Sequence, residues 1–312
     1  MADLAIYYEH PQWFAPLFAE LDRRNIDYVA HTLQDHSFDP GEPRLPAPVV
    51  FNRLAMSAFL RQDEHAIFYT IALMAHFEHR GARVINGSSS LAVDTSKARQ
   101  LSLFRSLGLE IPATRVVHRF ADVAAAAAQL RFPVMVKGDI GGSGAGMARY
   151  DTLEELTAFA AEQGTPAGLN GVTLVQEYVP AEAGRVIRCE TLGGRFLYAI
   201  ALDGAGSTFD LCPADVCMVD RQESGGPSIT ISAFEPPPEI VRAVEAAARA
   251  AHLDVGGIEY MVDERDGTPR FYDLNALSNF VANPQAVLGY DPHEKLVDLL
   301  EREIGLARKL AA

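Results

Sequence analysis

The feature that most constrains the fold of this chain is a pair of strand-like segments near its C-terminus, residues 257–262 and 270–275. The polar turn between them, which ends in glycine, predicts a β-hairpin. Side chains alternate faces along a strand, so Asp273 and Asn275 point to the same side. When the second strand folds back on the first, Glu259 reaches that side as well.

The same hairpin predicts a metal site. Two carboxylates and one amide oxygen on one face are hard ligands, which suit Mg²⁺ held beside phosphate groups. Tyr272 and Leu274 are expected on the opposite face. The sequence therefore predicts a hairpin with one metal-binding face.

Composition limits the classes of partner. The 312 residues can bury a full core, and domain sizes favour two or three subdomains. A net charge of −14 argues against binding to nucleic acid or to an anionic membrane. The longest apolar stretch, residues 66–77, is too short to span a bilayer, and no signal peptide is visible. We therefore expect a cytoplasmic protein. The odd number of cysteines, Cys189, Cys212 and Cys217, indicates reduced thiols. Cys212 and Cys217 have no partner Cys/His pair, which argues against a zinc site.

The chain begins with alternating strands and helices. Strands are predicted at 3–8, 48–51 and 83–85, and helices at 12–25 and 63–80. This alternation is typical of a small parallel sheet covered by helices. We assign residues 1–93 to an N-terminal α/β domain.

Two α+β lobes are expected to follow. In residues 94–180, strands are predicted at 115–117, 132–137, 147–150 and 174–179, with an alanine-rich helix at 121–130. In residues 181–312 we expect a hairpin at 186–202, a polar loop at 203–230, and helices at 236–251 and 293–304. The predicted fold class is α/β with two α+β lobes.

A glycine-rich loop lies between two strands of the central lobe and comprises Gly141, Gly142, Ser143, Gly144, Ala145 and Gly146. Glycines let backbone N–H groups approach phosphate oxygens. The loop opens no helix, so it is neither a Walker loop nor a Rossmann fingerprint, and a flexible hairpin is an equal alternative. Lys137, on the buried strand before it, needs an anion unless its ammonium reaches the surface. Together the lysine and the loop favour phosphate binding.

Three further signals are weaker. The strand end at 175–179 could offer backbone groups to an adenine edge, although an ordinary strand end is the simpler interpretation. Lys97, early on a helix, is more often a surface lysine than a ligand. Arg188 lies on an apolar strand and needs a carboxylate or phosphate, with a structural salt bridge as the competing interpretation.

Taken in order, these segments resemble the ATP-grasp superfamily, most closely the RimK-type glutamate ligases. The resemblance covers roughly residues 50–300, and the ordered set is far more specific than any one motif. The matching positions are 94–97, 134–137, 141–146, 175–179, 187–189, Glu259 and 273–275.

The resemblance implies an ATP-grasp fold, in which an N-terminal pre-ATP-grasp domain precedes two lobes that bind ATP between them. It places phosphates on Lys97, Lys137 and the glycine loop. It places adenine at Gln176, Glu177, Tyr178 and Val179. Two Mg²⁺ ions, which Mn²⁺ can replace, would bind to Glu259, Asp273 and Asn275. Arg188 and Lys137 would be catalytic, with Arg188 near the reacting phosphate or acyl substrate and Arg53 facing the substrate.

Several positions depart from the family pattern. The metal carboxylates run Glu then Asp, the reverse of the usual order, which leaves the total charge unchanged. RimK-type enzymes often have an acidic residue two positions before the arginine that matches Arg188. Val186 occupies that position here, and Glu182 is the candidate replacement for the ribose contact. D-Ala–D-Ala ligases have an arginine two residues before the first metal carboxylate. Gly257 occupies that position here, which argues against a D-Ala–D-Ala ligase. Two further regions differ where the acceptor would bind, and they contain Asp210, Ser278 and Asn279.

By resemblance, the chain is an ATP-dependent carboxylate–amine ligase. It would activate an acid as an acyl phosphate, form an amide or peptide bond, and release ADP and phosphate. The substrates would be a small carboxylate and amine, such as amino acids or peptides, or a protein tail, and homodimers are common in similar enzymes. Two alternatives stay open: an ATP-grasp kinase acting on a hydroxyl, and a nucleotide-binding module without catalysis.

Overall fold

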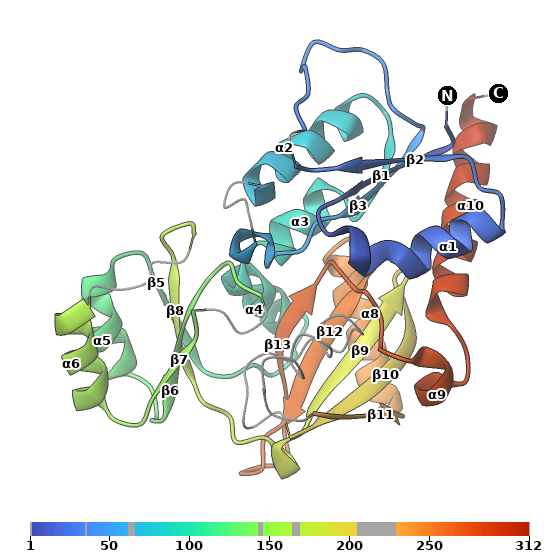
Figure 1. The fold of residues 1–312 in the computed structure, drawn as a ribbon. Helices are drawn as coiled ribbons and strands as arrows, with labels where there is room; N and C mark the ends of the chain where they lie inside the picture. The colour runs from blue at the N-terminus through green and yellow to red at the C-terminus, as the bar shows by residue number, and fades with distance from the viewer. Residues whose placement is uncertain are drawn as a thin grey trace.

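A computed structural model describes residues 2–34, 36–61, 66–142, 146–163, 169–204 and 229–311. In those ranges the strands form three sheets, which Figure 1 shows as separate layers with their helices. The mixture of helices and sheets confirms the predicted α/β class. No helix in the described ranges is long and apolar enough to cross a membrane.

The N-terminal sheet is parallel, as predicted, with the order β2-β1-β3-β4. Its strands are β1 (Leu4–Tyr8), β2 (Tyr28–Thr32), β3 (Val49–Arg53) and β4 (Arg83–Ile85). Helices α2 (Ala66–His79) and α3 (Ser88–Asp94) contribute to the core on one face. Helices α1 (Ala15–Arg23) and α10 (Pro292–Ala311) contribute to the core on the other. Because both faces are covered, β3 is buried along its whole length.

The central lobe has an antiparallel sheet in the order β5-β8-β6-β7. Its strands are β5 (Thr114–Val117), β6 (Val134–Gly138), β7 (Ala148–Tyr150) and β8 (Thr173–Glu177). Helices α5 (Val123–Ala127) and α6 (Leu153–Gln163) pack on one face, and Figure 1 shows them on the side away from the rest of the molecule. The opposite face of this sheet is therefore turned toward the other lobes.

The C-terminal lobe has an antiparallel sheet in the order β11-β10-β9-β12-β13. Its strands are β9 (Val186–Leu192), β10 (Arg195–Asp203), β11 (Thr230–Phe234), β12 (Val255–Val262) and β13 (Pro269–Asn275). Helices α4 (Lys97–Ser106) and α8 (Pro238–Ala250) bury one face. On the other face, Tyr198, Ile200 and Leu202 join the core that contains β1, β3 and α10.

Short elements complete the described chain. The 3₁₀ helices are η1 (Pro11–Phe14), η2 (Ala58–Leu60), η3 (Phe120–Asp122) and η4 (Glu182–Gly184), and α9 (Pro284–Leu288) precedes α10. The sequence did not predict α3, α9, β2 or β11. The alanine-rich helix is shorter than expected, and the terminal helix is longer. Most of the predicted 203–230 loop lies outside the described residues. The three domain boundaries stay predictions, since the first and third regions share a core.

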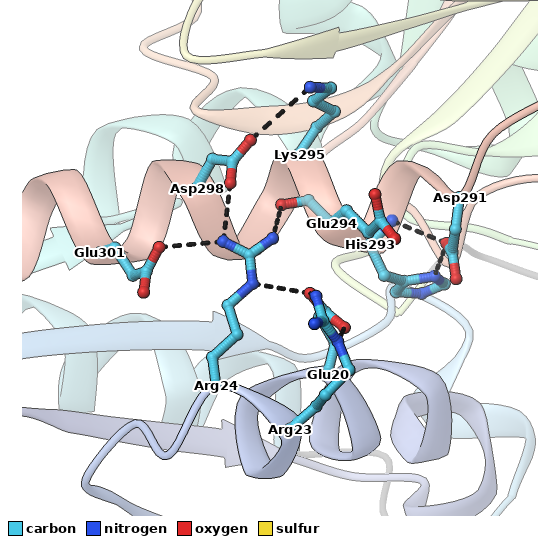
Figure 2. Close-up of polar contacts among 9 residues, drawn as sticks. All are labelled: Glu20, Arg23, Arg24, Asp291, His293, Glu294, Lys295, Asp298 and Glu301. Atoms are coloured by element: carbon cyan, nitrogen blue, oxygen red, sulfur yellow. Dashed lines mark hydrogen bonds and ion pairs between the residues drawn. The ribbon is translucent and has the colours of Figure 1, made fainter.

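Arg24 ties α1 to the C-terminal helix (Figure 2). Its guanidinium pairs with Glu20 at 2.6 Å, Asp298 at 2.7 Å and Glu301 at 2.9 Å. It also donates to the carbonyl oxygen of Glu294 at 2.9 Å. One arginine thus joins residues nearly the whole chain apart, and its side chain is 17% exposed.

We predict that Arg24→Met lowers the free energy of unfolding in urea by about 1 kcal/mol, with a smaller loss in high salt. The matched control is Arg23→Met, because Arg23 is 62% exposed and pairs with Glu20 on its own helix. A larger loss for the control would contradict the role given to Arg24.

Candidate active site

The C-terminal sheet presents two neighbouring rows of side chains on the face opposite α8. In the first row, Asp273 pairs in register with Glu259, and Glu259 pairs with Arg188. In the second, Asn275 pairs with Gly257, and Gly257 pairs with Glu190. The hairpin is therefore as predicted, with Glu259, Asp273 and Asn275 on one face, and a third strand adds a charged pair.

The metal-binding residues predicted from the sequence lie together. The Asn275 amide donates to Asp273 at 3.2 Å, which confirms that both side chains share a face. The prediction for Tyr272 was wrong: its hydroxyl donates to Glu259 at 2.7 Å. The register shifts between Glu259 and Tyr260, and this bulge leaves Tyr272 without an opposite residue and turns it to the polar face.

Arg188 is buried between two carboxylates. Its Nε donates to Glu190 at 2.6 Å and its Nη1 donates to Glu259 at 2.8 Å. Burial opposes its charge, but the negative charges of Glu190 and Glu259 outweigh burial and raise the pKa of Arg188. A Cβ on Gly257 would come within 2.5 Å of the guanidinium. Glycine therefore provides the space that Arg188 occupies.

The carboxylates fit a bound cation. Burial raises the pKa of Glu259, and the neighbouring Asp273 charge adds to that effect. Lys97 forms an ion pair with Asp273. Burial alone would lower the pKa of Lys97, but the Asp273 charge raises it. Among the described residues, no three His, Cys, Asp or Glu side chains form a metal-binding group. The two carboxylates and the Asn275 amide offer oxygen ligands, so a metal held there would take its remaining ligands from phosphate.

Lys137 lies on β6 of the facing lobe and is 4% exposed. Its ammonium donates to Gln176 at 2.9 Å, and the Gln176 amide donates to Thr114 at 2.9 Å. Burial, with the positive charge of Lys97, lowers the pKa of Lys137 to about 7. Lys137 does not reach the surface, so the alternative of an exposed ammonium is wrong.

Asp139, at the end of the strand that carries Lys137, couples the two lysines. Its carboxylate accepts from the backbone of Ala98 at 2.8 Å and from the Ser96 hydroxyl at 3.0 Å. Its backbone oxygen accepts from the Lys97 N–H at 3.0 Å. The N-terminus of α4 is therefore fixed to β6, which sets Lys97 and Lys137 relative to each other.

The glycine loop begins against the N-terminal domain. A Cβ on Gly142 would lie 2.9 Å from the Cβ of Ser57, so this close approach requires glycine. Gly146 has a φ of +67°, a left-handed conformation that also favours glycine. Ser143, Gly144 and Ala145 lie outside the described residues, and Gly141 is partly buried.

The predicted adenine segment joins β8 to the C-terminal lobe. Gln176 is used to hold Lys137, and Glu177 accepts from the backbone of Arg131 at 3.0 Å. The Tyr178 ring lies 4.4 Å from the Arg149 guanidinium carbon, and Val179 is buried. Glu182 is exposed in η4. The nucleotide contacts expected of these residues stay predictions.

The predicted substrate residues meet at the carboxyl end of β3. Arg53 donates to the backbone oxygen of Ser278 and to the Asn279 side chain at 3.3 Å. Its guanidinium lies 5.0 Å from the Phe14 ring centre and 4.9 Å from that of Phe51. Burial lowers the pKa of Arg53 to about 9. Asp210 lies outside the described residues.

Three polar side chains of the site were not given a role from the sequence. Glu190 and Tyr272 lie next to site residues that the sequence did predict. Strand alternation places Glu190 on the same face as Arg188. Asp94, at the end of α3, is buried near Asp273 and Lys97, and burial with the Asp273 charge raises its pKa to about 7. For Glu190, the spacing of two residues from Arg188 was the available signal.

Comparison with known proteins identifies the class. Ribosomal protein bS6–L-glutamate ligase of Escherichia fergusonii is 29% identical over 238 residues, which are 75% of this chain and 73% of the relative. A probable alpha-L-glutamate ligase of Trichodesmium erythraeum is 25% identical over 243 residues, 76% of this chain and 74% of the relative. A scan against models of protein families finds no match.

Solved structures show the same fold. The ATP-grasp ligase PsnB, complexed with a minimal precursor, superposes with a TM-score of 0.69 at 17% identity, over 97% of this chain and 100% of its own. A RimK domain protein from Sphaerobacter thermophilus gives a TM-score of 0.70 at 16% identity, over 96% and 99%. The chain therefore has the ATP-grasp fold, and its resemblance to RimK-type ligases is confirmed. It is an ATP-dependent carboxylate–amine ligase, an enzyme that forms C–N bonds.

We predict that Gly257→Ala lowers kcat/KM by about 10²-fold, because the added methyl group displaces the Arg188 guanidinium from its place between the two carboxylates. The matched control is Gly305→Ala on α10, where a Cβ meets no atom within 4 Å. The melting temperature of both variants reports on folding. Wild-type activity in Gly257→Ala would show that the position of Arg188 is unimportant.

We also predict that nucleotide binding takes up about one proton at about pH 8. Burial and Lys97 hold the pKa of free Lys137 at about 7, so it is mostly neutral at that pH. Bound phosphate raises this pKa, since an opposite charge favours the charged form. Below pH 7 the uptake disappears, because Lys137 is already protonated. Calorimetry in buffers of different ionisation enthalpy measures the protons, and uptake retained in Lys137→Met would contradict the assignment.

Proposed function

We propose that this enzyme transfers the γ-phosphate of ATP to a substrate carboxylate and then joins the acyl group to an amine. The observation that carries the proposal is the row Asp273, Glu259, Arg188, in which a buried guanidinium pairs with Glu259, one of the two carboxylates that fit a metal. Phosphoryl transfer depends mainly on positioning and charge neutralisation, which this row provides.

Residues of both lobes take part in the proposed reaction. Glu259, Asp273 and Asn275 hold Mg²⁺, which neutralises phosphate charge when bound. Lys97 exchanges its Asp273 partner for phosphate, and Lys137 contacts phosphate from the facing sheet. Arg188 stabilises the negative charge that develops on the transferred phosphoryl group. The glycine loop shields the acyl phosphate from water.

The substrates lie at the junction with the N-terminal domain. Arg53, Ser278 and Asn279 converge there, and Arg53 has no carboxylate partner among the described residues. One of the relatives named above is a ribosomal protein bS6–L-glutamate ligase, and PsnB has been solved in complex with a precursor peptide. We infer a carboxylate of an amino acid, peptide or protein end as the acyl donor. A cytoplasmic location, a homodimer and a second metal ion remain predictions.

The test is ADP release with Mg·ATP across amino acids, small acids, short peptides and amines, with the mass of every product. A condensed product lacking one water supports the ligase, whereas a phosphorylated product would identify a kinase. No ADP with any substrate would favour the nucleotide-binding module.

We predict that Asp273→Asn lowers ADP release by about 10²-fold or more, because it removes one of the two carboxylate charges that hold the metal. Asp122→Asn, which changes an exposed ion pair on η3, is the matched control and should keep wild-type activity. Full activity in Asp273→Asn would contradict the metal site.

A further inference from the structure

Glu190 is a buried carboxylate whose second oxygen has no partner. The residue is 0% exposed, and its Oε1 accepts from Arg188 at 2.6 Å. Its Oε2 is buried and makes no hydrogen bond. A buried carboxylate oxygen left unpaired is costly, so a site of this kind calls for a donor or a cation.

Arg53 is the matching group of opposite charge. It is 2% exposed, and its Nε and Nη1 groups are buried without acceptors. The charge of Glu190 acts on Arg53, raising a pKa that burial lowers, but the two form no ion pair. The Oε2 atom of Glu190 and the Nε and Nη1 groups of Arg53 are therefore buried without partners, although they belong to oppositely charged side chains that act on each other.

The sheet register places Glu190 in the row next to the one that contains Arg188, Glu259 and Asp273. It follows Arg188 on the same face of β9, about 7 Å further along the strand. Its cross-strand neighbours are Gly257 and Tyr198 rather than the metal carboxylates. With the reacting phosphate beside Arg188, as proposed above, a group bound by Glu190 would lie on the acceptor side of the reacting carbon.

We propose that the free oxygen of Glu190 binds the ammonium group of the amine substrate and accepts the proton that this group loses before its nitrogen attacks the acyl carbon, which selects amines that are cationic at neutral pH. The inference rests on the proposed ligase function and adds a specificity-determining residue to it. Gly257 permits this arrangement, because a side chain there would enter the space of Arg188, which holds Glu190 in place.

A purely structural role for Glu190 is the competing explanation, in which it only positions Arg188. The two explanations differ in the step that they affect. Arg188 serves phosphoryl transfer to the acid, whereas an ammonium site serves only the second step, attack by the amine. A nucleophile without positive charge separates these steps.

The experiment uses hydroxylamine, which is uncharged at pH 7 and traps an acyl phosphate as a hydroxamate. The full chain is assayed with Mg·ATP and the acid that condenses in the substrate panel. Each assay is run with hydroxylamine and, separately, with the amino acid or ammonium ion that serves as amine. The variants are Glu190→Gln, whose amide oxygen can still accept from Arg188, and the exposed control Glu239→Gln on α8.

We expect Glu190→Gln to raise KM for the cationic amine by about 10-fold or more and to lower hydroxamate formation by a distinctly smaller factor. Equal losses with both nucleophiles, or an unchanged KM for the amine, would overturn the inference while leaving the ligase function intact. Absence of hydroxamate and condensed product in the wild-type enzyme would instead refute the ligase function, and the inference with it.

Discussion

The active site depends on one buried charge cluster, the guanidinium of Arg188 held between Glu190 and Glu259. An arginine with carboxylates on two sides stays protonated, so a fixed positive charge lies in the interior of the molecule. The arrangement needs a strand position without a side chain, which Gly257 supplies. The neighbouring Glu259 then links this charge to the predicted metal-binding hairpin. The residues proposed for phosphoryl transfer and for metal binding therefore share one sheet face.

The N-terminal domain and the C-terminal lobe are joined so that Arg53 and Arg188 belong to one framework. The apolar side chains of the two regions form a common core, and α10 covers one face of the N-terminal sheet. Asn86 reinforces the joint, since its side chain accepts from the backbone N–H groups of Asp254 and Val255 and donates to the Val255 carbonyl at 2.7 Å. The central lobe contributes Lys137 and the glycine loop from the other side of the site.

The sequence was sufficient for the parts of the site that depend on strand alternation. Asp273 and Asn275 lie on one face because the side-chain period of a strand is two, and Glu259 follows from the hairpin. Tyr272 was placed on the wrong face because a bulge breaks that period, and the sequence has no clear signal for the bulge. The short strand β2 lies at the sheet edge and is half-exposed, so it lacks the apolar run that marked β1 and β3. The lack of a partner for Glu190 Oε2 and for Arg53 Nε and Nη1 depends on contacts far apart in the chain, which no local pattern encodes.

The central claim is that a substrate carboxylate attacks the γ-phosphate and the resulting acyl phosphate then reacts with an amine. Labelling the acid with ¹⁸O in its carboxylate and recording the mass of the released phosphate tests this directly. Attack through a labelled oxygen, followed by cleavage of the bond between that oxygen and the acyl carbon, predicts one ¹⁸O atom in each phosphate. Phosphate that contains no ¹⁸O, released together with a condensed product, would contradict the acyl phosphate.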